Sequence, residues 1–338
     1  MGDCYRRSTK IDFNEGAQPN PATASLVVNA ALAWCDKRVL MAGGYNGPTG
    51  HSTTQVLEYD CGTKQWTNYS ATLALPEPRS EATMVCVGST FYLFGGYNDR
   101  KVLGSMLKLT LPAGEGAKGA TGTWEVVECQ QKPSARRGHS IALMPVEGDE
   151  EPKFYVFGGF DGTKRLDDLW EFNAATSTWS CLSCEGTGPT PRDSCALVAD
   201  ANSEKRLLVF GGYTNSRVND IFSLNLATMT WTQYSADGAP SPRMGCFGAA
   251  NGTYAVFGLG QDCKGPTAMV CQLNHEKKWT VSTPEGDELE ANTQFSWTVA
   301  DGGKKVYVYG GFNEKRYSNV LYEIELERSE PQAAAKKK

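Results

Sequence analysis

The chain has 338 residues, including 36 glycines and 16 prolines, and carries a formal net charge of −5. This acidic balance, without a sustained basic stripe, argues against a nucleic-acid-binding protein. No segment is apolar over the length of a membrane span and no secretory signal opens the chain, so we expect a protein of the cytosol or nucleus that does not enter membranes. The 11 cysteines are scattered along the sequence, and we expect them to be reduced.

A short apolar run that ends in a glycine pair and an aromatic residue recurs along the chain. The copies are VLMAGGY ending at Tyr45, FYLFGGY ending at Tyr97, FYVFGGF ending at Phe160, LLVFGGY ending at Tyr213 and VYVYGGF ending at Phe312. A sixth copy, YAVFGLG, carries Leu259 where the second glycine is expected. Because successive copies lie about 50 residues apart, the pattern indicates one structural unit repeated six times.

Two further elements recur in register with the glycine pairs. A tryptophan follows every copy except the one that ends at Phe312, at Trp66, Trp124, Trp179, Trp231 and Trp279. A Pro-x-x-Arg corner precedes four copies and ends at Arg79, Arg136, Arg192 and Arg243. Together the three elements resemble the kelch repeat over nearly the whole chain. The resemblance implies an all-β fold, a six-bladed kelch β-propeller with one four-stranded blade per repeat around a central channel.

The repeats predict a single propeller domain over residues 1–328. In chain order we expect the six blades at 22–70, 79–128, 136–183, 192–235, 243–283 and 292–327. Blade six lacks a tryptophan strand, because Pro331 stands in a polar tail where that strand is expected. Residues of about 4–13 have no glycine pair, so we expect them to close blade six as its outer strand. Residues 329–338 are expected to form a disordered basic tail.

Two insertions interrupt the repeat. Residues 111–123 of blade two contain glycines at positions 114, 116 and 119, but a strand follows rather than a helix. This G-x-G-x-x-G pattern therefore predicts a surface loop and not a dinucleotide site. Residues 145–153 of blade three form an acidic insertion. The two loops are the second surface through which we expect an adaptor of this kind to join an assembly.

The chain offers few groups for catalysis or metal binding. Its three histidines, His51, His139 and His275, lie in different repeats at non-equivalent positions, which argues against a shared metal centre. Cys181 and Cys184 form a C-x-x-C without a second pair. We therefore expect no catalytic residue, no metal and no cofactor, in an adaptor or scaffold protein. The alternative is a kelch-type enzyme, a sugar isomerase or lyase, acting on a small sugar-like or acidic metabolite in the central channel.

Candidate binding residues gather in the loops next to the glycine pairs. Kelch adaptors that capture peptides use an aromatic residue directly after the pair, and the resemblance extends this role to Tyr45, Tyr97, Phe160, Tyr213 and Phe312. The same loops carry basic residues, among them Arg100, Arg165, Arg217 and Arg316. We expect the corner arginines to reach the same face, namely Arg79, Arg136, Arg192 and Arg243. A basic, aromatic face on an acidic monomer favours a protein or peptide partner, in particular an acidic or phosphorylated one.

A structural role is the alternative for every one of these arginines. Loop arginines can form salt bridges between blades, with Asp168, Asp220 or a neighbour as the acid. Corner arginines can donate to backbone carbonyls of adjacent turns. The same alternative applies to His139, which stands where kelch repeats commonly carry a histidine that joins neighbouring turns. The sequence leaves both roles open for the arginines.

Overall fold

The computed structural model describes residues 6–11, 26–111, 122–146, 148, 150–201, 205–250, 254–282 and 285–326. Regular structure in these ranges is almost entirely β, with one short 3-10 turn, η1 (Asp301–Gly303). No helix in this part of the chain is long and apolar enough to cross a membrane. The insertion loop at 112–121 and the expected tail at 329–338 lie outside the described residues.

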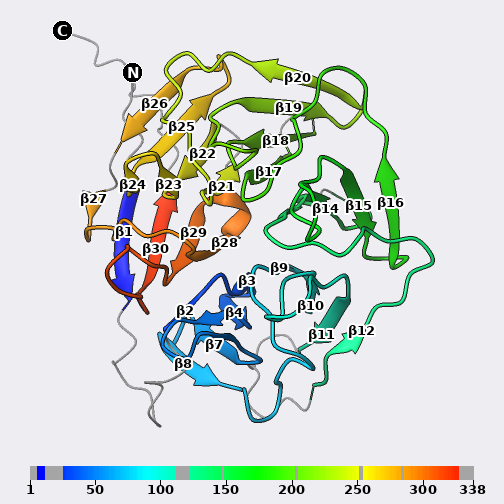
Figure 1. Ribbon diagram of the computed structural model, residues 1–338, viewed down its shortest axis with the longest axis vertical. Helices are drawn as coiled ribbons and strands as arrows, with labels where there is room; N and C mark the ends of the chain where they lie inside the picture. The colour runs from blue at the N-terminus through cyan, green and yellow to red at the C-terminus, as the bar shows by residue number, and fades with distance from the viewer. Residues whose placement is uncertain are drawn as a thin grey trace, which may run out of the picture.

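Six antiparallel four-stranded arrays surround a common axis in the described residues (Figure 1). Each runs from an inner to an outer strand. The first three are β3 (Ala31–Cys35), β4 (Arg38–Ala42), β7 (Val56–Asp60) and β8 (Gln65–Asn68); β9 (Thr83–Val87), β10 (Thr90–Phe94), β11 (Met106–Thr110) and β12 (Glu125–Val126); and β13 (Ser140–Leu143), β14 (Lys153–Phe157), β15 (Leu169–Asn173) and β16 (Thr178–Leu182).

The other three arrays follow the same plan. They are β17 (Ala196–Asp200), β18 (Arg206–Phe210), β19 (Ile221–Asn225) and β20 (Thr230–Tyr234); β21 (Phe247–Ala250), β22 (Tyr254–Gly258), β25 (Val270–Asn274) and β26 (Trp279–Ser282); and β28 (Ser296–Ala300), β29 (Lys305–Tyr309), β30 (Leu321–Leu326) and β1 (Arg6–Ile11). The loops and linkers contain additional two-residue strands: β2 (Val27–Val28), β5 (Tyr45–Asn46), β6 (His51–Ser52), β23 (Gln261–Asp262), β24 (Gly265–Pro266) and β27 (Glu285–Gly286).

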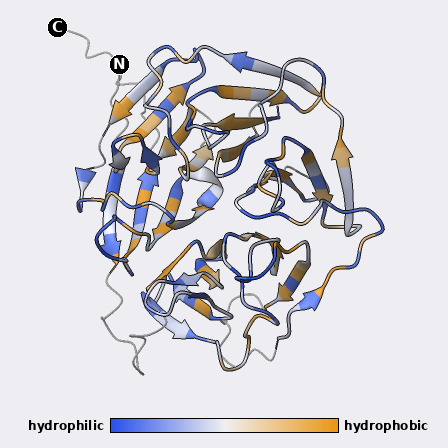
Figure 2. Ribbon diagram, viewed as in Figure 1, coloured by the Kyte–Doolittle hydropathy of each residue, from blue (hydrophilic) through white to orange (hydrophobic). Residues whose placement is uncertain are grey.

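The inner strands close into a ring. Strand β3 contacts β9, and the contacts continue through β13, β17, β21 and β28 back to β3. A separate hydrophobic cluster fills each of the six junctions between neighbouring arrays. Figure 2 shows the hydrophobic residues concentrated on these inner and middle strands. The fold is therefore a β-propeller in which each array is a blade. The apolar faces of each blade are buried against the two neighbouring blades.

The N-terminal strand takes the outer place in blade six. Strand β1 pairs antiparallel with β30, in a register that runs from Arg6 opposite Leu326 to Ile11 opposite Leu321. On its other edge β1 pairs in parallel with β27, part of the linker from blade five. The hydroxyl of Ser8 donates to the carbonyl of Glu285, at 3.2 Å. The first and last strands of the chain thus close the ring between them, as the missing tryptophan strand predicts.

The tryptophans of the outer strands pack against the preceding blade. Trp231 of blade four lies edge-on to Phe157 of blade three, with ring centroids 6.2 Å apart. Trp66 of blade one lies in the same way against Tyr309 of blade six, at 5.7 Å. Buried aromatic pairs of this kind add to the stability that burial itself provides. The repeated tryptophan is therefore a contact between blades.

Blade five carries the glycine motif one residue later than the sequence pattern predicts. Strand β22 ends at Gly258, so Leu259 takes the first glycine position, Gly260 the second and Gln261 the aromatic position. Leu259 has φ of +58°, close to the values of the first glycines in other blades. A Cβ on Gly258 would lie 2.5 Å from Phe247 Cε1, so that ring fills the space beside it. The expectation that Leu259 replaces the second glycine is wrong, because the preceding Gly258 belongs to the strand.

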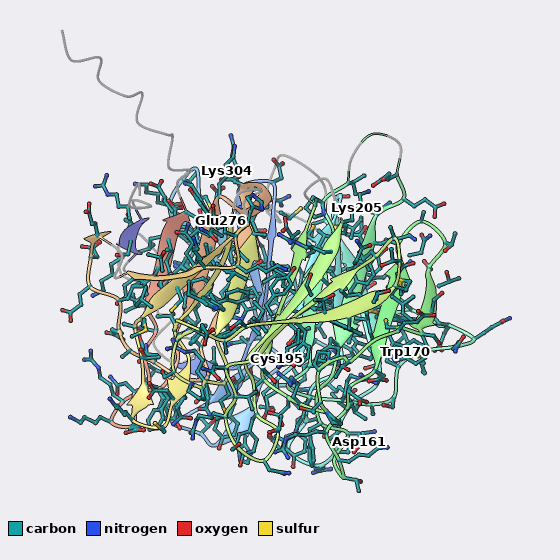
Figure 3. All side chains as sticks on the ribbon, turned by 90° about the horizontal axis from the view of Figure 1, so that it is seen from above. Asp161, Trp170, Cys195, Lys205, Glu276 and Lys304 are labelled. Atoms are coloured by element: carbon teal, nitrogen blue, oxygen red, sulfur yellow. The ribbon has the colours of Figure 1, made fainter. Side chains whose placement is uncertain are left out.

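The strand order gives the propeller two different faces. The loops between the second and third strands share one face with the linkers between blades, and we call it the corner face. The turns that join strands one to two and three to four share the opposite face, the hairpin face. In Figure 3, Asp161 of the corner face lies at the opposite end of the molecule from Lys205, Glu276 and Lys304 of the hairpin face.

Candidate binding face

The four corner arginines are buried. Each guanidinium donates to the carbonyl of the first residue of the glycine motif in its own blade, as Arg136 Nη1 does to Gly158 O at 3.0 Å. The side chains of Arg79, Arg136, Arg192 and Arg243 belong to residues that are only 0–1% exposed. The expectation that these arginines reach the binding surface is therefore wrong. A buried guanidinium needs fixed acceptors, and the backbone of the glycine turn provides them.

Two of the corner arginines also form paired hydrogen bonds with an aspartate. Arg136 donates to both carboxylate oxygens of Asp168, at 2.7 and 2.8 Å, and Arg192 donates to both oxygens of Asp220, at 2.6 and 3.0 Å. Burial opposes ionisation of Asp168, but the hydrogen bonds and charge of Arg136 outweigh it and lower the pKa of this carboxyl. The alternative inferred from the sequence assigns Asp168 and Asp220 to loop arginines of neighbouring blades, whereas the structure pairs them with the corner arginines of their own blades. The donation to backbone carbonyls, which is the alternative for the corner arginines, is present as well.

The glycine pair and the corner arginine also link neighbouring blades. The second glycine of one blade donates its N–H to the carbonyl of the next corner arginine, as Gly96 does to Arg136 O at 2.9 Å. A Cβ on Gly95 would lie 2.5 Å from that same oxygen, so the backbones approach too closely for a side chain. In blade six Asn292 replaces the arginine and donates Nδ2 to Gly310 O at 3.0 Å. The glycine pairs of blades one to four are thus each hydrogen-bonded through the backbone to the corner arginine of the next blade.

The aromatic residues after the glycine pairs all lie on the corner face, partly exposed. Four of them form a β-bridge with the residue that directly follows the corner position of the same blade: Tyr97 with Ser80, Phe160 with Arg137, Tyr213 with Asp193 and Phe312 with Thr293. Tyr45 pairs in the same way with Val28 in the small sheet of blade one. All five side chains are intermediate in exposure. The bridges fix the backbone of each aromatic residue and leave part of its ring accessible.

Two arginines alternate with three of these aromatic rings, and we call the set Tyr97, Arg137, Phe160, Arg165 and Tyr213 the ladder. Arg137 Cζ lies 5.1 Å from the ring centre of Tyr97 and 5.5 Å from that of Phe160. Arg165 Cζ lies 6.0 Å from the centre of Phe160 and 4.5 Å from that of Tyr213. These distances are in the range of cation–π contacts. The ladder therefore holds blades two, three and four in one continuous surface strip.

The positive charges of the two ladder arginines are balanced by acidic side chains. Arg137 Nη1 lies 2.8 Å from Glu81 Oε1, and Arg165 Nε lies 2.6 Å from Asp193 Oδ2. Burial raises the pKa of Glu81, and the charge of Arg137 opposes that shift. The centre of the corner face is consequently an amphipathic strip without a strong net charge. From the sequence we expect a basic, aromatic face, whereas the arginines at its centre are paired with acids.

Unpaired basic side chains lie at the loop tips. The side chain of Asn98 accepts hydrogen bonds from the N–H groups of Arg100 and Lys101, and Asp161 does the same for Thr163 and Lys164. Such turns fix the loop backbone. Arg100, Lys101 and Lys164 are exposed, and no ion pair to them occurs among the described residues. The loop tips therefore supply positive charge around the neutral ladder.

The other two loop arginines of the expected set differ from Arg100. Arg316 Nη2 lies 3.0 Å from Glu290 Oε1, in an ion pair whose arginine is largely exposed. Arg217 is half-buried and keeps a buried Nε without a hydrogen-bond partner in the described part of the chain. The structure thus places all four loop arginines on the corner face, with Arg165 and Arg316 paired to acids.

The channel opens to the corner face through a ring of backbone hydrogen bonds. The residues that open the six inner strands have positive φ, and five of them donate to the preceding one around the axis: Asn29, Glu81, Gly138, Ser194 and Gly245, starting from Gln294. Behind this ring lies a cavity of about 630 Å³ lined by the inner strands. No group of three or more acidic, histidine or cysteine side chains suited to a metal ion occurs among the described residues.

His139 joins two blades inside the wall of this channel. Its Nε2 lies 2.7 Å from Thr83 Oγ1, and its ring lies edge-on to Phe94. Burial lowers the pKa of His139 to about 3, and the charge of Arg136 adds to the shift. The imidazole is therefore neutral at pH 7 and acts as a structural contact, in agreement with the kelch resemblance.

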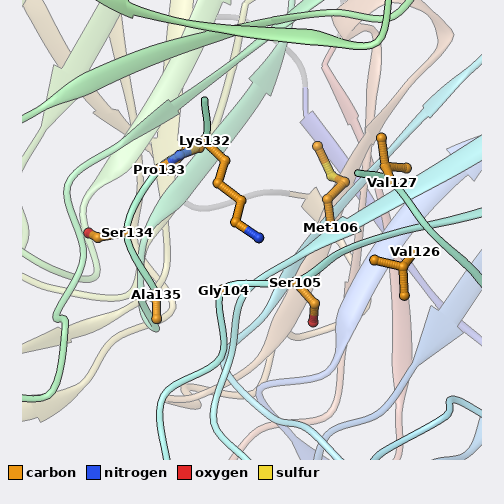
Figure 4. A pocket seen from close by; sticks show the side chains of 9 residues that line it. All are labelled: Gly104, Ser105, Met106, Val126, Val127, Lys132, Pro133, Ser134 and Ala135. Carbon is orange, nitrogen blue, oxygen red and sulfur yellow. The ribbon is translucent and has the colours of Figure 1, made fainter. Parts of the chain in front are cut away.

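A surface recess of about 530 Å³ lies between the outer part of blade two and the linker to blade three (Figure 4). It is lined by residues 104–106 that follow the loop of blade two, by 126–127 of its outer strand and by the linker 132–135. Val126, at its edge, is 54% exposed, and Lys132 is the charged side chain of the lining. An apolar recess with one cation can receive a side chain of a bound partner.

Sequence reasoning missed the residues that complete the ladder. Arg137 directly follows the corner arginine of blade three. The acids that pair with the ladder arginines, Glu81 and Asp193, lie two residues and one residue after the corner arginines of blades two and four. The sequence feature that could have revealed Arg137 is the pair of consecutive arginines, Arg136 and Arg137, in blade three. One arginine of this pair is buried and the next is on the surface, because successive residues of an extended strand point to opposite sides.

Comparisons with known proteins agree with this architecture. The KLHDC2/KLHL20/DRC7 Kelch-repeats domain matches residues 29–260. Host cell factor 2 of Homo sapiens is 31% identical over 284 residues, which cover 67% of this chain and 35% of that protein. Acyl-CoA-binding domain-containing protein 5 of Arabidopsis thaliana is 30% identical over 207 residues, covering 59% of this chain and 31% of that protein.

A third relative matches more of the chain at lower identity. Leucine-zipper-like transcriptional regulator 1 homolog of Drosophila melanogaster is 26% identical over 284 residues, which cover 80% of this chain and 28% of that protein. The chain thus spans between 28% and 35% of the length of these three relatives. The repeated glycine, arginine and tryptophan elements, the closed ring of blades and the domain match over residues 29–260 together show that this chain belongs to the kelch-repeat proteins.

Proposed function

We propose that the chain is a non-catalytic protein-binding module and that its partner docks on the corner face. The observation that carries the proposal is the row of five partly exposed aromatic side chains on this one face. Aromatic residues and arginine are the side chains that dominate binding energy at protein interfaces. Membership of the kelch-repeat family supports a role in protein interaction.

The partner segment has two chemical parts in this proposal. An apolar or aromatic side chain covers the ladder, where Phe160 lies between Arg137 and Arg165. Acidic or phosphorylated residues on either side meet the loop tips, where Arg100 and Lys164 are exposed. Charge at the edge of an interface chiefly raises the association rate, whereas the buried centre sets the dissociation rate. The neutral ladder thus supplies affinity and the loop tips supply steering.

The recess between blades two and three extends the same surface outward. Gly104 and Ala135 lie two residues from Val102 and Arg137, respectively, and those two residues pair with the aromatic positions of blades two and three. A side chain of the partner that follows the one on the ladder would enter this recess. Val126 and the aliphatic part of Lys132 would then be covered.

The experiment starts from a partner isolated by affinity purification with the full chain and then purified. Its affinity is measured for the wild type, for Tyr97→Ala combined with Phe160→Ala, and for the matched control Lys304→Ala on the hairpin face. We expect the double variant to lose at least about tenfold in affinity, the scale of an interface hot spot, at an unchanged melting temperature. Equal affinity of all three proteins would show that the partner binds elsewhere.

A further inference from the structure

Two cysteine thiols from neighbouring blades meet on the wall of the channel. Cys35 ends β3 and Cys86 lies in β9, and these inner strands of blades one and two are in contact. Cys35 Sγ lies 3.1 Å from the carbonyl oxygen of Gly88, and Cys86 Sγ lies 3.4 Å from the same oxygen. Both thiols therefore lie beside one backbone oxygen, at the junction of the two blades. The shared acceptor brings the two thiols to the same place on the channel wall, which is the first requirement for a bond between them.

The pair has a reactive and a resolving member. The hydrogen bond from Cys86 lowers the pKa of Cys35, burial opposes this, and the charge of Arg38 adds to the lowering. The same hydrogen bond, together with burial, raises the pKa of Cys86. Thiolate character makes a cysteine the nucleophile, so Cys35 reacts first and Cys86 keeps its proton.

The channel gives small molecules access to both sulfurs. Cys35 and Cys86 line the cavity of about 630 Å³ and are 6% and 9% exposed. Two other cysteines of the lining differ in their surroundings: Cys246 is 1% exposed, and Cys195 Sγ is 3.3 Å from the hydroxyl of Ser140. A small oxidant in the channel therefore meets two thiols that share one acceptor, at the end nearer the hairpin face.

We propose that Cys35 and Cys86 are a reversible oxidation site at which hydrogen peroxide forms a disulfide between blades one and two. The Cys35 thiolate attacks one peroxide oxygen, an S–O bond forms, the O–O bond breaks and the leaving hydroxide takes a proton to become water. The Cys86 sulfur then attacks the Cys35 sulfur, the S–O bond breaks and the hydroxyl leaves with the Cys86 proton as a second water. The two thiols lose two electrons and the peroxide gains them, and a thiol reductant such as glutathione reverses the change.

The disulfide would be a covalent link between the inner strands of two neighbouring blades. A cross-link between distant parts of a chain stabilises the fold, mainly by restricting the unfolded state. Because Cys35 and Gly88 lie at the hairpin end of their strands, the bond leaves the ladder on the corner face in place. Oxidation should thus raise the melting temperature without changing the corner face.

The test uses the full chain treated with hydrogen peroxide, blocked with an alkylating agent and cleaved by trypsin without reductant. Cys35 falls in the tryptic peptide 11–37 and Cys86 in the peptide 80–100, and each of these peptides contains one cysteine. We expect 11–37 linked to 80–100 to be the most abundant linked pair, and we expect dithiothreitol to remove both the link and the rise in melting temperature. Oxidation of the exposed Cys181 and Cys263 without this link would overturn the proposal.

A pair of single variants separates the two roles. In Cys86→Ser the Cys35 sulfenic acid has no resolving thiol, so dimedone should label Cys35 in this variant and not in the wild type. Cys195→Ser is the matched control from the same channel and should form the Cys35–Cys86 link as the wild type does. Equal dimedone labelling of Cys35 in the wild type and in Cys86→Ser would contradict the assignment of Cys86. If Cys86→Ser does not fold, the linked peptides of the wild type decide the proposal.

Discussion

Arg136 donates to both carboxylate oxygens of Asp168, at 2.7 and 2.8 Å, although the arginine itself is 0% exposed. The same guanidinium donates to Gly158 O. One side chain therefore links the segment before blade three to the glycine turn of that blade and to Asp168, which directly precedes β15. Arg136, one of the four corner arginines that the sequence predicts on the binding face, is thus a buried structural contact. Substitution of Arg136 tests this structural role.

Arg136→Ala should destabilise the protein strongly. The change leaves Asp168 without its paired cation and Gly158 O without a donor, and removal of one partner of a buried ion pair costs about 3 to 5 kcal/mol. Because Asp168 is partly exposed, the lower end of that range is expected. Urea unfolding monitored by circular dichroism measures the change. The matched control Arg100→Ala, at an exposed loop tip, should stay within about 0.5 kcal/mol of the wild type. An equal loss in both variants would contradict the structural role of Arg136.

Stability should fall in mild acid because of His139. Its pKa in the folded protein is lowered to about 3 by burial, whereas an unfolded chain has a histidine pKa of about 6.5. Between these values the unfolded state binds the proton, so the contribution of His139 is complete above pH 6.5 and is lost as the pH falls toward 3. From pH 7 to 4.5 the loss is about 2 to 3 kcal/mol.

The variant His139→Gln isolates this contribution. It loses the imidazole and hence the proton uptake on unfolding, so the difference in unfolding free energy between wild type and variant should shrink from pH 7 to pH 4.5. Urea unfolding at both pH values gives the two differences. A difference that stays constant would mean that His139 does not titrate between the folded and unfolded states.

Removal of the N-terminal strand should open blade six. Strand β1 is paired on both edges, with β30 and with β27, and its loss exposes a row of backbone groups on β30. A chain that begins at residue 14 should melt at a much lower temperature than the full chain. Ser8→Pro should lower the melting temperature in the same direction, because it removes a donor in the middle of β1. A truncated chain that melts like the full one would place the ring closure elsewhere.

Gly95→Ala should be much more harmful than Gly302→Ala. Both glycines have positive φ, +68° and +63°, so both substitutions carry the backbone strain of about 1 to 2 kcal/mol. Only at Gly95 would the added Cβ meet neighbours, Arg136 O at 2.5 Å and His139 Cε1 at 2.8 Å, whereas nothing lies within 4 Å of a Cβ at Gly302. Equal unfolding free energies of the two variants would show that the close backbone joint is not required.

The fold was predictable from the sequence because each repeated residue makes the same kind of contact between blades wherever it occurs. Glycine pairs, tryptophans and corner arginines all carry such contacts, so their spacing implies a ring of blades, and the missing strand of blade six points to β1. The register of blade five was not predictable in the same way. Phe247 fills the space beside Gly258, and this compensation comes from a different strand.

The binding face was predictable only in part. The aromatic positions follow directly from the glycine pair, and the structure places all five on the corner face. The state of each arginine was not visible, because it depends on whether the extended chain turns a residue inward, as at Arg136, or outward, as at Arg137. The acids that neutralise the ladder, Glu81 and Asp193, come from other blades than their partners Arg137 and Arg165 and could not be assigned from spacing.

Photo-cross-linking on the two faces tests most directly whether the corner face binds the partner. The photoreactive amino acid p-benzoylphenylalanine replaces Phe160 on the corner face in one protein and Lys304 on the hairpin face in the other, and both are irradiated with the purified partner. We expect cross-links from position 160 that Tyr97→Ala with Tyr213→Ala abolishes, and none from position 304. Cross-links from position 304 alone would contradict a docking site on the corner face.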